Sequence, residues 1–143
     1  MMNVKVLLTK VLQKLKTHDT SLSQIATPIT DSMSSVTMAH TTYTKLAQIS
    51  LPANGKYLII MNGGCGAVSS GTYFSLSTYV SSGTASTTWN ATQMAPTNAG
   101  GQCSGIGYYV TGNAGITVQL RGYLYDSGST SGAWGTLAAV QIG

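Results

Sequence analysis

The chain has 143 residues, of which 43% are hydrophobic and only 7% are charged, and its formal net charge is +4. This length accommodates one domain with a buried core, and the hydrophobic content excludes a disordered chain. Four of the seven basic residues lie between Lys5 and Lys16, so the remainder is nearly neutral. A neutral body lacks the basic surface that phosphate binding requires, and we expect no nucleic-acid partner.

Residues 1–27 predict an N-terminal helix. Apolar side chains recur there at alternating steps of four and three residues, which is the a/d spacing of a coiled coil. Leu7 and Leu12 widen the apolar stripe, which favours three or more parallel helices over two. Two alternatives remain open: a helix on a membrane surface, and a helix that packs on the chain's own body. The candidate trimer-interface residues of this segment are Leu8, Val11, Leu15 and Leu22.

The same segment does not fit a secretory signal or a membrane span. Thr9 and Lys10 interrupt its apolar run, whereas a signal peptide needs about 7–15 uninterrupted apolar residues and a span about 20. We therefore expect a protein without its own signal peptide and without a membrane span, made in the host cytoplasm.

Residues 28–42 predict a linker or edge segment, and residues 43–143 predict a head domain of short β-strands separated by turns such as Asn54-Gly55. Several strands with no helix among them indicate a mainly β fold, as in a β-sandwich or jelly roll. The strands are expected at 43–49, 56–61, 72–80, 106–110, 116–125 and 136–143.

Two of these strands predict how the faces are used. The strand at 56–61 is apolar on both faces, so we expect burial on both sides, with the second face covered by another subunit. The strand at 116–125 alternates. Its expected inward residues are Ile116, Val118, Leu120 and Leu124, and its expected outward residues are Gln119, Arg121, Tyr123 and Tyr125.

Groups that could support catalysis are scarce. The chain has two His and three acidic residues, all of them Asp, and lacks a nucleophile-elbow motif and metal-ligand spacing. We therefore expect no enzyme, no cofactor and no metal. Cys65 and Cys103 are too few for a disulfide framework, and one bridge or two buried thiols both remain open.

Two loop-rich stretches hold the candidate ligand-binding residues. Exposed tryptophans beside amides suit sugar recognition, because the ring stacks on the apolar sugar face while the amides bond the hydroxyl groups. The alternative is that both tryptophans fill the ends of the core. The candidates are Trp89, Asn90, Gln93 and Asn98 in the first stretch, and Asp126 and Trp134 in the second.

Three segments carry a resemblance to a known family. "LPANGKYLIIM" resembles the Gly-x-Tyr strand of tumour-necrosis-factor/C1q-like jelly-roll domains, "VTGNAGITVQL" resembles the turn into a long inner strand, and "LAAVQIG" resembles the last strand. The resemblance covers about residues 43–143. The chain departs from the family in lacking a Phe-x-Gly-Phe ending and the acidic clusters of calcium-binding members.

The resemblance implies a homotrimer with Tyr57 inside the sandwich. It makes Tyr108, Tyr109, Tyr123 and Tyr125 candidate interface residues, the alternative being ordinary strand tyrosines that half-cover a sheet. A coiled segment before such a head also resembles phage tail-fibre and receptor-binding proteins.

We therefore expect a non-enzymatic, trimeric virion structural or attachment protein of a phage or prophage, located on the virion or at the extracellular surface. Its head would bind a bacterial surface ligand, a glycan or a protein receptor. The alternative is a bacterial C1q-like trimerisation or binding module with no viral role.

Overall fold

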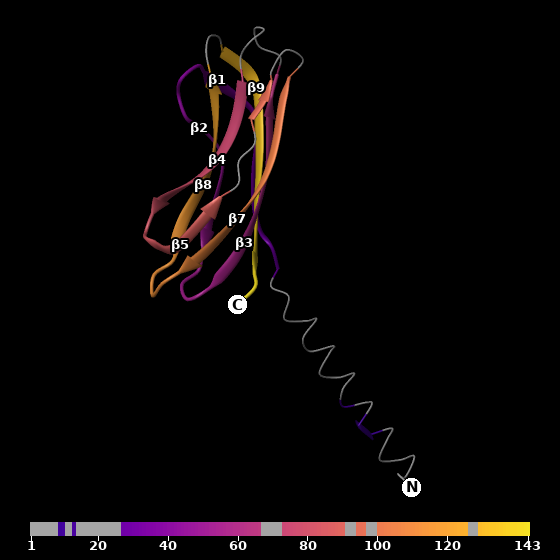
Figure 1. Ribbon diagram of the computed structural model, residues 1–143, viewed down its shortest axis with the longest axis vertical. Helices are drawn as coiled ribbons and strands as arrows, with labels where there is room; N and C mark the ends of the chain where they lie inside the picture. The colour runs from indigo at the N-terminus through magenta and orange to yellow at the C-terminus, as the bar shows by residue number, and fades with distance from the viewer. Residues whose placement is uncertain are drawn as a thin grey trace.

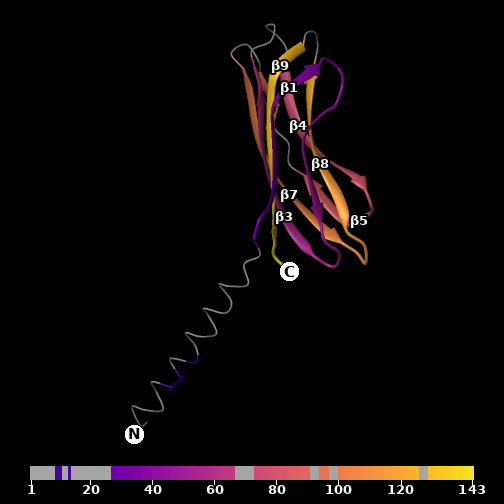
Figure 2. The ribbon, with the colours of Figure 1, turned by 180° about the vertical axis from the view of Figure 1, so that it is seen from behind.

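Two antiparallel sheets pack face to face in this computed structural model, which describes residues 9, 10, 13, 27–66, 73–90, 94–96, 100–125 and 129–143. The five-stranded sheet has the order β1-β9-β3-β7-β5, and the four-stranded sheet has the order β2-β8-β4-β6. Figure 1 shows the two layers from the side, and Figure 2 shows them from behind. The predicted mainly β architecture is therefore confirmed as a β-sandwich.

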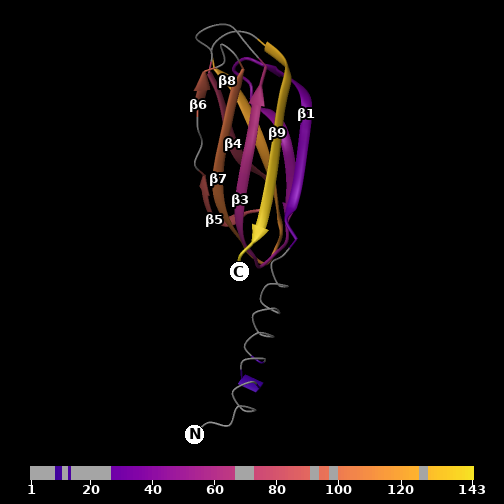
Figure 3. The ribbon, with the colours of Figure 1, turned by 90° about the vertical axis from the view of Figure 1, so that its right-hand side faces the viewer.

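The strands of the described chain are β1 (Ile29–Ala39), β2 (Thr44–Leu51), β3 (Lys56–Cys65), β4 (Tyr73–Ser82), β5 (Ala85–Asn90), β6 (Met94–Pro96), β7 (Gly101–Thr111), β8 (Ile116–Tyr125) and β9 (Ser129–Gln141). Figure 3 looks onto the five-stranded sheet, where β7, β3 and β9 lie side by side in front of β4 and β8.

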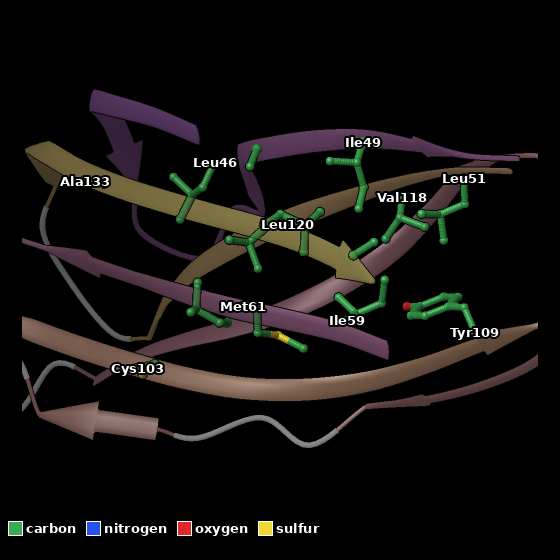
Figure 4. Close-up of a cluster of buried hydrophobic side chains, with 14 of the residues drawn as sticks. Leu46, Ile49, Leu51, Ile59, Met61, Cys103, Tyr109, Val118, Leu120 and Ala133 are labelled. Atoms are coloured by element: carbon green, nitrogen blue, oxygen red, sulfur yellow. The ribbon is translucent and has the colours of Figure 1, made fainter. Parts of the chain in front are cut away.

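The core forms between the sheets because every second residue of the central strands is apolar. In β8 the predicted alternation is confirmed, since its four inward aliphatic residues are at most 2% exposed. Figure 4 shows Leu46, Ile49 and Val118 pointing toward Ile59 and Met61 of the opposite sheet. Tyr57 lies in this core, as the resemblance implied.

The β2–β3 turn shows why the sequence reads Gly-x-Tyr at this point. Asn54 has a φ of 55°, in the left-handed region that Asn tolerates. The ring of Tyr57 lies across Gly55, where a Cβ would stand 2.5 Å from the ring carbon Cε2. The Thr111 side chain completes the turn by accepting a 2.9 Å hydrogen bond from the Gly55 N–H and donating a 2.7 Å bond to the Pro52 carbonyl.

Strand pairing extends the β-structure beyond the expected ranges. The segment predicted as a linker or edge becomes the long edge strand β1, because it pairs with β9 from Ile29↔Ala139 to Ala39↔Ser129, with irregular register near Val36. The expected loop around Trp134 is likewise part of β9, and β5 and β6 arise within the expected loop before residue 106. Polar residues with weak strand propensity enter these strands because a neighbouring strand satisfies their backbone groups.

The predicted N-terminal helix lies almost wholly outside the described residues. Thr9, Lys10 and Gln13 have helical backbone, and these three positions alone do not define a helix. No described segment is a helix of the length and apolarity that a membrane crossing needs.

Candidate binding surfaces

The exposed apolar side chains sort onto the two outer surfaces of the sandwich. Nine large hydrophobic side chains of the described residues are exposed. The aliphatic ones belong to the five-stranded sheet or its end, and the tyrosines belong to the four-stranded sheet or to the segment before it, with Met33 of β1 as the ninth. The two surfaces therefore offer different chemistry to a partner.

We define the aliphatic face as the two apolar cross-strand rows on the outside of the five-stranded sheet. In the first row Leu58 pairs with Tyr108 on one side and with Val140 on the other. In the second row Ile60 pairs with Ile106 and Ala138. The next row is polar, with Asn62, Ser104 and Thr136.

The aliphatic face shows that one prediction, the burial of both sides of the strand at 56–61, does not hold within a single chain. The strand predicted to be buried on both sides, β3, buries only one side there, because Leu58 is 37% and Ile60 is 48% exposed. Their inward neighbours Ile59 and Met61 are at most 1% exposed. The second apolar side has no cover from the described part of the chain.

We define the tyrosine face as the outer surface of the four-stranded sheet. Register pairs Tyr73 with Tyr125 and Tyr79 with Gln119. Tyr43, just before β2, packs its ring 4.7 Å from that of Tyr123. Other described members of the face include Lys45, Gln48, Ser75, Ser77 and Arg121.

A line of polar contacts crosses the tyrosine face. Gln119 donates from Nε2 to Oε1 of Gln48 at 2.9 Å. Arg121 donates to Oε1 of Gln119 from both Nε (3.0 Å) and Nη2 (2.8 Å). The Arg121 guanidinium carbon also lies 3.6 Å from the centroid of the Tyr79 ring, a cation–π contact. Gln119 therefore holds one edge of the guanidinium, and the Tyr79 ring covers one of its two flat faces.

The structure separates the tyrosines proposed for a trimer interface. Tyr108 is half-buried on the aliphatic face, whereas Tyr123 and Tyr125 lie on the tyrosine face. The assignment of Tyr109 is wrong, because strand alternation turns it inward and leaves it 1% exposed. Its hydroxyl instead hydrogen-bonds that of Thr78 inside the sandwich. The helix candidates Leu8, Val11, Leu15 and Leu22 lie outside the described residues.

The loop residues proposed for ligand binding do not form a described cluster. Gln93, Asn98 and Asp126 lie outside the described residues, and Trp89 and Asn90 are placed only by the backbone of β5. Trp134 is neither a loop residue nor a core plug. It is half-buried on the outer side of β9, over Gly64, where a Cβ would stand 3.0 Å from its Nε1.

Two findings concern the described groups that could bind a metal or act as a nucleophile. No group of three His, Cys, Asp or Glu residues among them is placed to hold a metal. Cys65 and Cys103 are both buried and unbridged, which decides between the two open alternatives. Burial raises the pKa of the Cys65 thiol, partly offset by a backbone hydrogen bond at Gly101. Such a thiol is a poor nucleophile because little of it ionises near neutral pH.

Sequence reasoning missed the tyrosine face as a unit. Alternation did predict that Arg121 and Tyr123 point outward, but it could not show that β2 and β4 flank β8.

No protein-family model matches the chain, and no curated protein sequence matches it.

Proposed function

We propose that this chain is the subunit of a homotrimeric, non-enzymatic attachment protein that a phage or prophage virion uses to bind a bacterial surface. The observation that carries the proposal is the aliphatic face, an apolar surface left uncovered by the described chain. Contiguous apolar patches of this kind mark sites of protein association. We infer that the aliphatic face is covered by the same face of another copy of the chain.

The strand order supports a jelly roll of the tumour-necrosis-factor/C1q-like type. Strands β1, β3, β7 and β9 lie in one sheet, while β2, β4 and β8 lie in the other. The chain therefore crosses between the sheets at most of its connections, which is typical of double-sheet jelly rolls. The close contact between Gly55 and Tyr57 also gives a physical reason for the Gly-x-Tyr motif on which the resemblance rests.

Energetics favour covering this face in an assembly. Leu58, Ile60 and Ile106 are 37–48% exposed. Full burial of such a side chain is worth about 1.5–3 kcal/mol, so covering the exposed part adds on the order of 1 kcal/mol each. Association also costs at least about 4 kcal/mol in lost rotational and translational freedom. Several copies of both apolar rows are therefore needed, as when three copies close around an axis.

Charge and connectivity favour a sister copy as the occupant. The two apolar rows contain no charged residue, so identical faces do not repel one another. The heptad segment predicted at residues 1–27 leads directly into β1, whose first residue Ile29 pairs with Ala139. Ala139 lies in β9 between Ala138 and Val140 of the aliphatic face. Parallel association of those segments would bring the faces of sister copies together.

The test is the molar mass of the full chain by light scattering after size-exclusion chromatography. We expect about three times the chain mass of 14.8 kDa. Ile60→Lys should shift the mass toward one chain, because it places a charge in the middle of the apolar rows. Met33→Lys is the matched control, since it makes the same change at an exposed apolar residue of β1 outside the face.

A wild-type mass of one chain would contradict the trimer, as would an Ile60→Lys variant that keeps the full wild-type mass. Far-UV circular dichroism of each variant shows whether it remains folded. The virion and bacterial-module alternatives are separated by neighbouring genes: flanking capsid and tail genes support the former, and their absence supports the latter.

A further inference from the structure

The tyrosine face carries a guanidinium that is held in place with one edge free. Two of the five N–H donors of Arg121 point to Gln119, and Gln119 is itself held by Gln48. The two donating atoms, Nε and Nη2, share one edge of the guanidinium plane. Within the described residues, the Nη1 side has no partner. That edge matches the two oxygens of a carboxylate, which arginine binds through parallel hydrogen bonds.

Nearby charges favour an acidic ligand. Lys45 pairs with Arg121 across β2 and β8, which places a second cation on the same face. The described residues of the face include no acidic side chain. The one acidic side chain among the described residues is Asp31 of β1, and its Oδ2 accepts the backbone N–H of Gln48 at 2.7 Å. Two cations remain far short of the extended basic surface that nucleic acids require.

Aromatic rings flank the guanidinium along the sheet. Tyr79 supports Arg121 from one side. Beyond Arg121, Tyr123 packs against Tyr43 and edge-on against Tyr125, with centroids 4.7 and 4.6 Å apart. Rings that already contact one another lose little freedom on binding. Exposed tyrosines offer an apolar surface for sugar C–H groups and hydroxyls for sugar oxygens.

We propose that the tyrosine face binds a carboxylated carbohydrate, with Arg121 holding the sugar carboxylate and the tyrosines contacting the adjoining rings. This inference deepens the proposed attachment function, on which it rests, by naming the ligand class and the site. The site differs from the tryptophan loops expected from the sequence. Neutral glycans can offer hydroxyl oxygens to the free edge of Arg121, but they lack the paired anionic oxygens that make the charge-assisted bidentate contact.

The test measures binding of the full chain to four acidic probes by isothermal titration calorimetry: trigalacturonate, an alginate trimer, a hyaluronan hexasaccharide and sialyllactose. We expect at least one probe to bind, and its methyl ester to bind about tenfold more weakly or worse, since the ester removes the charge-assisted hydrogen bonds. Affinity should also fall between low and high salt. Binding to none of the four, or equal binding of acid and ester, would overturn the proposal.

Variants locate the site. Arg121→Gln should weaken binding at least about tenfold, and Arg121→Lys should restore only part of it, because lysine keeps the charge without the planar fork. Lys56→Gln is the matched control, since it removes an exposed cation from the five-stranded sheet. An Arg121→Gln loss no larger than that of Lys56→Gln would place the ligand elsewhere.

Light scattering on the same samples separates this inference from the proposed trimer. A monomer that binds an acidic probe contradicts the trimer and leaves the site standing. A trimer that binds none of the probes contradicts the carbohydrate site and leaves the proposed trimer standing. Arg121→Gln should keep the wild-type mass, because the substitution lies outside the aliphatic face.

Discussion

Replacing Gly55 with alanine tests the contact that gives the Gly-x-Tyr motif its shape. The new Cβ would stand 2.5 Å from Cε2 and 2.6 Å from both Cζ and the hydroxyl oxygen of Tyr57. Non-bonded carbons normally lie about 3.5–4.0 Å apart, so the ring must move by roughly 1 Å. Tyr57 is 1% exposed in the core, and its neighbours leave the ring little room to move.

The expected cost is the balance of three effects. Overpacking of a core costs about 1–3 kcal/mol. Moving the ring also weakens the 3.3 Å hydrogen bond from the Tyr57 hydroxyl to the Pro52 carbonyl, worth about 1 kcal/mol. The opposing term is the lower entropy of the unfolded chain, about 0.4–1 kcal/mol in favour of alanine where the backbone permits it. We therefore expect the free energy of unfolding to fall by about 2 kcal/mol.

Urea unfolding at one fixed protein concentration measures this change, because the stability of an assembly depends on concentration. Gly112→Ala is the matched control: Gly112 adjoins the same turn and has nothing within 4 Å of its Cβ position. It should unfold at or slightly above the wild-type midpoint. In the Gly55→Ala background, Tyr57→Leu should cost less than it does in the wild type, since there it also removes the clash with the alanine Cβ. Equal midpoints for Gly55→Ala and Gly112→Ala would refute the reasoning.

Two further predictions follow from burial and from the N-terminal spacing. Native protein at pH 8 should not react with Ellman's reagent, because Cys65 and Cys103 are buried and the pKa of Cys65 is raised. After unfolding in urea, two thiols per chain should react. Fast reaction of the native protein would contradict this burial. A raised thiol pKa stabilises the fold below the unfolded value of 9.0, and that contribution is lost as the pH rises through the folded value. Removing residues 1–27 should lower the melting temperature of the assembly. An unchanged melting temperature would mean that the segment is a linker that does not stabilise the assembly.

The sequence predicted those parts of the fold that strand periodicity determines locally. The inward residues of β8 and the Asn54-Gly55 turn were correct, because alternation and turn chemistry depend on near neighbours in the chain. The lengths of β1 and β9 were missed. Their polar ends become strand by pairing with each other, and that pairing joins residues about a hundred positions apart.

The candidate surfaces depend even more on sheet order. Ile60 and Ile106 share a row only because β3 and β7 are neighbours, and no periodicity within either segment shows this. The assignment of Tyr108 and Tyr109 to one interface was a different error, which alternation within the strand could have avoided. Adjacent strand residues point to opposite sides, so only Tyr108 could face outward with Ile106.

Placing the two faces on opposite sheets has a consequence for attachment. A subunit that buries its aliphatic face in a trimer leaves its tyrosine face outside, so that three ligand sites are displayed together. A protein that holds one carboxylate through one arginine binds weakly, and three linked sites can raise the apparent affinity for a polymeric surface by about 10²–10⁴. The predicted low affinity of one site is then no obstacle to stable attachment.

Ile60→Lys therefore gives a final, sharper prediction. If it dissociates the assembly, it should leave the affinity for a short acidic oligosaccharide unchanged, because Ile60 and Arg121 lie on different sheets. Retention on a surface coated with the corresponding polysaccharide should nevertheless fall at least about tenfold, since only avidity is lost. Met33→Lys should retain both properties. If Ile60→Lys dissociates the trimer yet is retained on the coated surface as well as the wild type, the three sites do not act together.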